Sequence, residues 1–235
     1  MKGIASMSII SLWQLGGRRA VDLALRPSVT LDENWKKKIL PPLLQTKEVS
    51  MRAHRFLSRY VASQRALVAV PSDAGTDRLV WAIVLLKPCR LESFLLHIGA
   101  LFAAQEVRQV IDKREVDAYK QVLGDALYWF MLQRAPLLGA VALGPSQRHG
   151  PERIMTAIRG AGHAALSQLC EQHQSGLWER VQLMLPDIQP DPAQAGASAY
   201  STIIEAPTLR RMAMKTLREL ETTWASRFLT DNRFV

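Results

Sequence analysis

Apolar residues recur at spacings of three and four in the segment after Pro88, and this period constrains the fold more than any other feature of the sequence. An α-helix turns once in about 3.6 residues, so this spacing places the side chains on one helical face. Pro88 suits a first helical turn, whose N–H groups have no partner within the helix. The segment therefore predicts a core helix that continues, with a bend, to Asp112. The stripe comprises Leu91, Phe94, Leu95, Ile98, Leu101 and Phe102.

Capping residues and prolines delimit further helices. Asp32 and Asp112 are suited to N-caps, and Glu115 completes capping-box spacing with Asp112. Gly124 predicts a bend, and Pro136 favours a helix end at Ala135. The apolar run at 79–86 fits a buried helix or a strand, and we favour a helix. The remaining pattern predicts helices at residues 32–40, 47–64, 88–112, 112–135, 151–174, 177–185 and 207–228.

These segments predict an all-α fold, a compact multi-helix orthogonal bundle with room for minor irregular or short β elements. We expect a single helical domain over residues 1–235. Residues 1–15 are interpreted as an N-terminal extension that need not be ordered. Residues 186–200 are rich in Pro, Ala, Asp and Gly, which is typical of an exposed loop. Gly160 and Gly162 predict close packing of their helix against another.

Apolar runs and cysteine usage predict a cytoplasmic protein. No apolar run approaches the roughly 20 residues that a membrane-spanning helix needs. The N-terminus lacks the continuous apolar stretch and cleavage site of a signal peptide. The two cysteines, Cys89 and Cys170, lie far apart in sequence and suggest no disulfide framework.

The sequence contains none of the motifs that most often reveal an enzyme of this size. A phosphate-binding glycine loop, a dinucleotide-binding fingerprint, a nucleophile elbow and an H-E-x-x-H zinc motif are all missing. The best metal candidate combines Cys170 and His173 with His163 and Cys89, but a buried cysteine and surface histidines explain these residues better. We therefore expect no enzyme, no catalytic residues, no cofactor, no metal and no small-molecule substrate.

Positive charge is concentrated in the N-terminal quarter. The formal net charge is +9, and residues 1–65 contain 12 Lys and Arg against 4 Asp and Glu. The remaining 170 residues are nearly balanced, with 18 against 17. Uncompensated charge repels itself unless a partner neutralises it, so this asymmetry predicts an acidic partner. The candidate partner-binding residues are Lys36, Lys37, Lys38, Arg52, Arg55 and Arg59.

Several segments, read in order, resemble the K component of the bacterial type III secretion sorting platform, the SctK or YscK family. These segments are LRPSVTLDENWKKKILP (25–41), CRLESFLLHIGALFAAQEVRQVI (89–111), VLGDALYWFMLQRAPLL, LWERVQLMLP (177–186) and the terminal WASRF. Val29 stands where the family often has an aromatic residue, and Ala103 and Ala104 stand where it often has glycine. The order of these segments carries more weight than any one of them.

The resemblance implies a cytoplasmic adaptor, peripheral to the inner-membrane secretion apparatus. Its implied partners are the cytoplasmic domain of an SctD-like inner-membrane ring protein and an SctQ-like pod protein, in a platform that also contains the L and ATPase components. We expect the basic cluster to face an acidic patch on one partner protein. The alternative is a basic helical nucleic-acid-binding regulator, although no helix-turn-helix, zinc-finger or RNA-binding signature accompanies the charge.

Overall fold

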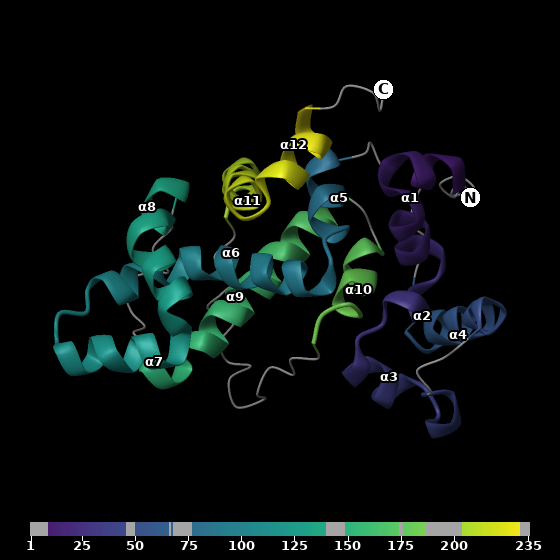
Figure 1. Cartoon of the computed structure of the whole chain (residues 1–235), viewed down its shortest axis with the longest axis horizontal. Coiled ribbons are helices and arrows are strands. Elements are labelled where there is room, and N and C mark those ends of the chain that lie inside the picture. The colour runs from purple at the N-terminus through teal and green to yellow at the C-terminus, as the bar shows by residue number, and fades with distance from the viewer. Residues whose placement is uncertain are drawn as a thin grey trace. The chain divides into compact units, whose positions relative to one another are not determined.

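The computed structural model describes residues 9–45, 50–65, 67, 77–139, 149–173, 176–186 and 204–230, and it contains no strand within them (Figure 1). The predicted all-α fold class is confirmed. The chain divides into two compact units, which we describe separately. Unit 1 comprises residues 1–91, 170–189 and 226–235, and unit 2 comprises residues 92–169 and 190–225. Three of the four boundaries between them fall within helices. The prediction of one domain stays a prediction.

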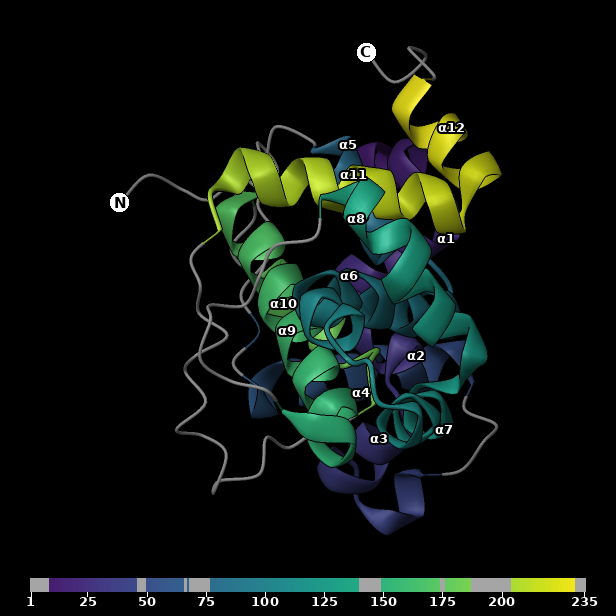
Figure 2. The same ribbon diagram turned by 90° about the vertical axis from the view of Figure 1, so that its left-hand side faces the viewer.

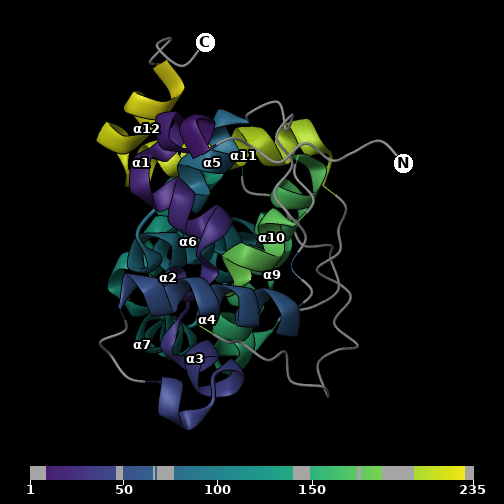
Figure 3. The ribbon, with the colours of Figure 1, turned by 90° about the vertical axis from the view of Figure 1, so that its right-hand side faces the viewer.

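Unit 1 is built around the N-terminal helices. Helix α2 packs against both α1 and α4, and α1 also contacts α10. Figure 3 shows α2, α3 and α4 close together in this unit. The helices are α1 (Ile9–Leu25), α2 (Pro27–Thr30), α3 (Glu33–Ile39), the 3-10 turn η1 (Pro42–Leu44), α4 (Met51–Gln64), α5 (Arg78–Val84) and α10 (Leu177–Gln182).

A buried arginine joins α10 to the end of α1. Arg180 is 5% exposed, its Nε donates a hydrogen bond to Ala24 O at 3.3 Å, and its Nη1 donates to Gly176 O at 2.8 Å. Buried carbonyl oxygens need donors, and a guanidinium has five N–H groups to supply them. The arginine in the segment LWERVQLMLP therefore has a structural role in unit 1.

Unit 2 is formed mainly by the central helices. Helix α8 packs against α11, as Figure 2 also shows. The apolar stripe that follows Pro88 is buried, as the period predicts. The helices that lie wholly or partly in this unit are α6 (Pro88–Arg108), α7 (Lys113–Trp129), the π-helical turn η2 (Phe130–Arg134), α8 (Ala135–Leu138), α9 (Gly150–His173), α11 (Ala206–Leu220) and α12 (Thr222–Thr230).

Helix starts agree well with the sequence. Asp32 accepts a hydrogen bond from Asn34 N, and Asp112 accepts from Arg114 N and Glu115 N, as capping predicts. Gly124 breaks α7 with a φ of 74°, which only glycine adopts readily. The ambiguous run at 79–86 is helical up to Val84, and each of its residues is buried. A strand is therefore excluded for this run.

Several predicted helix boundaries are wrong. Helix α4 begins at Met51 and not at residue 47, and α10 ends at Gln182 and not at residue 185. The core helix ends at Arg108 and does not reach Asp112. Pro136 does not end a helix at Ala135, because it lies in the first turn of α8, which follows the π-helical turn. The single final helix is in fact two, separated at Glu221, whose φ of −136° and ψ of 57° are not helical. Most of the predicted exposed loop at 186–200 lies outside the described residues.

Two glycines allow α6 and α9 to cross closely within unit 2. A methyl group added at Gly99 would overlap Ile158 O and lie 2.9 Å from Gly162 N. A methyl group at Gly162 would overlap Leu95 O. The predicted close packing is therefore confirmed for Gly162, and its partner glycine is Gly99.

A carboxylate anchors the start of α9. Oε1 of Glu106 accepts three hydrogen bonds, each at 2.9 Å, from Tyr119 OH, His149 N and Gly150 N. The first N–H groups of a helix lack partners within it, and the helix dipole favours negative charge at that end. Glu106 therefore connects α6, α7 and α9 within unit 2.

Candidate protein-binding surface

A small apolar cluster of unit 1 holds α3 and α4 together. Leu57 and Val61 of α4 are buried against Leu31, Leu40 and Leu183. Trp35, Ile39 and Leu67 pack on this cluster while remaining partly exposed. The six predicted basic residues lie on these two helices, so the structure brings them into one region. We call Lys36, Lys37, Lys38, Arg52, Arg55 and Arg59 the basic surface.

The start of α3 is fixed against the end of α10. Asp32 N donates a hydrogen bond to Leu183 O at 2.8 Å, and Trp35 Nε1 donates to Gln182 O at 3.0 Å. Lys38 Nζ lies 5.6 Å from the centre of the Trp35 ring, and Arg65 Cζ lies 4.1 Å from the same centre. Such cation–π contacts hold basic groups beside an aromatic ring. Arg65 is a basic residue of this region that the sequence prediction missed.

The three lysines of α3 differ in their surroundings. Lys36 Nζ forms an ion pair with Glu33 Oε1 at 2.6 Å and is only partly exposed. Lys37 and Lys38 are exposed. The charge of Lys36 also helps to lower the pKa of His54 on α4, after the larger effect of burial. Lys36 therefore lies close to α4, and its positive charge is partly neutralised.

The three arginines of α4 are exposed on one side of the helix. Arg52, Arg55 and Arg59 follow each other at spacings of three and four. None of them forms an ion pair with a carboxylate in the described part of the chain. Because the charges are close and uncompensated, this side of α4 favours contact with an acidic group.

Apolar side chains share the exposed side of α4. Phe56 is 69% exposed, Met51 44% and Tyr60 38%. These three side chains are exposed, whereas Leu57 and Val61 of the same helix are buried. Large exposed apolar groups beside arginines are typical of protein interfaces.

A buried polar cluster positions α2 on α4. Ser28 Oγ lies 2.8 Å from Ser58 Oγ and 3.0 Å from His54 Nδ1, and it donates a hydrogen bond to His54 O at 3.1 Å. Ser28 and Ser58 are 3% and 4% exposed. A serine that is buried and hydrogen-bonded in this way fixes the helix pair.

The metal candidates from the sequence differ in their surroundings. Burial raises the pKa of Cys170 to about 12, because removal from water disfavours the thiolate. Cys89 is exposed, and burial lowers the pKa of His163 to about 4. The side chain of His173 lies outside the described residues. Among the described side chains, no group of three potential ligands could hold a metal ion.

The fold and this surface define an all-α protein that exposes a basic region interleaved with aromatic side chains. The family model for YOP proteins translocation protein K (YscK) matches residues 20–226, which covers most of both units. The chain belongs to the YscK family and is therefore a component of a type III secretion system. Comparisons with curated proteins and with solved structures gave no match. In the described part of the chain, every helix is too short or too polar to cross a membrane.

Proposed function

We propose that this protein is a non-enzymatic cytoplasmic adaptor of the secretion apparatus. It links the inner-membrane ring protein to the sorting platform that contains the Q, L and ATPase components. Membership of the YscK family supports a role in the apparatus, and the basic surface on α3 and α4 supports a role in binding. The observation that carries the proposal is the set of exposed arginines beside Phe56, none of which has a carboxylate partner among the described residues.

A protein partner explains this surface better than a nucleic acid does. Binding to phosphates requires only positive charge, whereas Phe56, Met51 and Tyr60 expose apolar area that a partner can bury. Interfaces concentrate binding energy in aromatic residues and arginines. We therefore expect the partner to present acidic side chains around an apolar patch. A nucleic-acid partner would instead bind mixed-sequence DNA with a steep salt dependence.

Reversal of charge on the basic surface tests the proposal. The variant carries Lys37→Glu, Arg52→Glu, Arg55→Glu and Arg59→Glu, all at exposed positions. Recruitment to the secretion complex is expected to fall at least about tenfold, because acidic groups on the partner would then be repelled; tenfold corresponds to roughly 1.4 kcal/mol. Recruitment is measured as the amount of tagged protein recovered with isolated secretion complexes.

A matched control reverses four exposed charges of unit 2. These substitutions are Lys113→Glu, Arg114→Glu, Arg153→Glu and Arg211→Glu. The net charge changes equally in both variants. If recruitment depends on the basic surface and not on net charge, the control should be recruited as well as the wild type. Unchanged recruitment of the basic-surface variant, or an equal loss in the control, would show that this surface does not bind the apparatus.

A further inference from the structure

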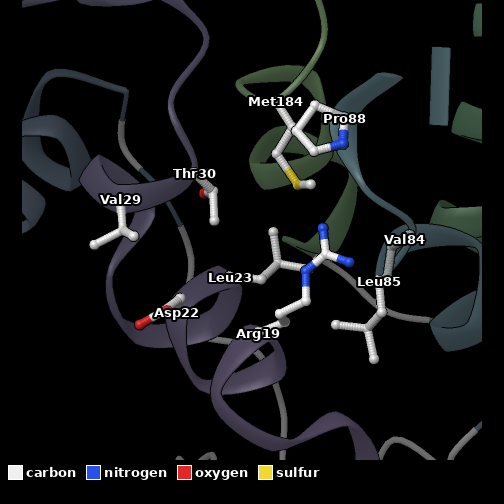
Figure 4. Close-up of a pocket in the computed structure, with 9 residues that line it drawn as sticks. All are labelled: Arg19, Asp22, Leu23, Val29, Thr30, Val84, Leu85, Pro88 and Met184. Atoms are coloured by element: carbon white, nitrogen blue, oxygen red, sulfur yellow. The ribbon is translucent and has the colours of Figure 1, made fainter. Parts of the chain in front are cut away.

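A pocket of about 210 Å³ opens in unit 1, and none of the residues that line it belongs to the basic surface (Figure 4). Its walls come from α1, α2, the end of α5, the start of α6 and the segment that follows α10. Most of the side chains that line the pocket are apolar, so the pocket suits an apolar group. The lining residues are Arg19, Asp22, Leu23, Val29, Thr30, Val84, Leu85, Pro88 and Met184.

A cationic group projects into this apolar space. Figure 4 shows the Arg19 guanidinium between Leu23 and Met184. Arg19 is partly buried, and its Nη2 donates a hydrogen bond to Leu86 O at 3.1 Å. A guanidinium has five N–H donors, and the described residues provide no carboxylate that pairs with Arg19. Burial lowers the pKa of Arg19, because removal from water disfavours its charge.

The carboxylate that lines the pocket is engaged elsewhere. Asp22 Oδ1 lies 2.8 Å from Arg26 Nε, and Asp22 Oδ2 lies 3.5 Å from Arg18 Nε. In Figure 4 its carboxylate points away from the Arg19 guanidinium. Arg18 and Arg26 thus pair with this carboxylate, and Arg19 has no carboxylate partner among the described residues. An added carboxylate would pair with Arg19 in a partly dry site, where such hydrogen bonds are strong.

We propose that this pocket receives an acidic side chain, together with an apolar neighbour, from a partner polypeptide. Small-molecule sites usually enclose about 300–1,000 Å³, so the volume of this pocket better fits one or two side chains. The aliphatic walls would bury the apolar neighbour, and Arg19 would bind the carboxylate in a forked arrangement. The choice of a protein as the source rests on the proposed adaptor function. The site itself shares no residue with the basic surface.

Peptide titration of the purified full-length chain tests the pocket. The probe is acetyl-Leu-Glu-Leu-amide, followed by NMR through the methyl group of Met184, which is assigned with Met184→Leu. A saturable shift is expected with this peptide. Binding of acetyl-Leu-Gln-Leu-amide should be at least fivefold weaker, because the neutral amide cannot form the ion pair. Free glutarate should bind more weakly than the glutamate peptide, because it lacks the apolar neighbours.

Three variants test the contributions of Arg19 and of the pocket volume to binding. Arg19→Gln should abolish the preference for the glutamate peptide, whereas Arg19→Lys should keep part of it. Val29→Phe fills the pocket while leaving Arg19 in place, and it should abolish the shift. Failure to saturate, equal binding of both peptides, or glutarate binding as tight as the peptide would each overturn the proposal. None of these outcomes depends on recruitment through the basic surface. The pocket proposal can therefore be rejected without rejecting the proposed adaptor function, and the reverse also holds.

Discussion

Replacing Gly99 with alanine is expected to reduce the free energy of unfolding by about 4 kcal/mol, at the upper end of what over-packing costs. The new methyl group would overlap Ile158 O where α6 crosses α9. A backbone carbonyl cannot rotate away as a flexible side chain can, so the helices would have to separate. Urea unfolding, followed by circular dichroism, measures the change.

The sign of this effect distinguishes packing from helix propensity. Alanine is favoured over glycine in a helix by roughly 1 kcal/mol, so propensity alone predicts that Gly99→Ala stabilises the protein. Gly160→Ala is the matched control, because Gly160 lies in α9 but is only partly buried. The control should be neutral or slightly stabilising. A loss below about 1 kcal/mol for Gly99→Ala would contradict the close crossing.

Replacing Glu106 with alanine is expected to cost about 3 kcal/mol, because one carboxylate oxygen accepts three hydrogen bonds. Two of the donors are backbone N–H groups at the start of α9, which would lose their protein acceptor. The loss is measured by urea unfolding. Hydrogen exchange at the amides of His149 and Gly150 provides a local readout and should become faster.

Glu106→Gln serves as the graded control. Its side-chain carbonyl can still accept hydrogen bonds, but it lacks the charge that strengthens them at a helix N-terminus. We expect a loss of about 1 kcal/mol, between those of wild type and Glu106→Ala. Equal stability of all three proteins would show that the carboxylate does not anchor α9.

Local signals in the sequence predicted much of the fold. Asp32 and Asp112 were identifiable as caps because a capping side chain bonds to N–H groups only two or three residues away. The helix end predicted at Pro136 was wrong because local signals can be ambiguous. A proline is tolerated in a first helical turn as well as after a helix end, and the π-helical turn before it has no signature that we recognised.

Features that depend on contacts between residues far apart in the sequence could not be predicted from it. The partner of Gly162 is Gly99, and the donors to Glu106 lie more than forty residues away in two of three cases. The basic surface was predictable because lysines and arginines are rarely buried. The exposure of Phe56 was not predictable from the sequence. Helical periodicity does not show which apolar residues of a helix pack against a distant residue such as Leu183. The pocket around Arg19 also required tertiary structure, because its walls come from several separate segments.

Site-specific photo-crosslinking from Phe56 tests the central claim most directly, namely that the exposed side of α4 binds the secretion apparatus. Phe56 is 69% exposed, so a photoreactive phenylalanine derivative should be accepted there without loss of folding. Ile111 in unit 2, which is 93% exposed, serves as the control position. We predict that Phe56 crosslinks in cells to a protein of the type III secretion system, and that Ile111 does not give the same product. Crosslinks from Phe56 to nucleic acid, or the same product from both positions, would contradict the account.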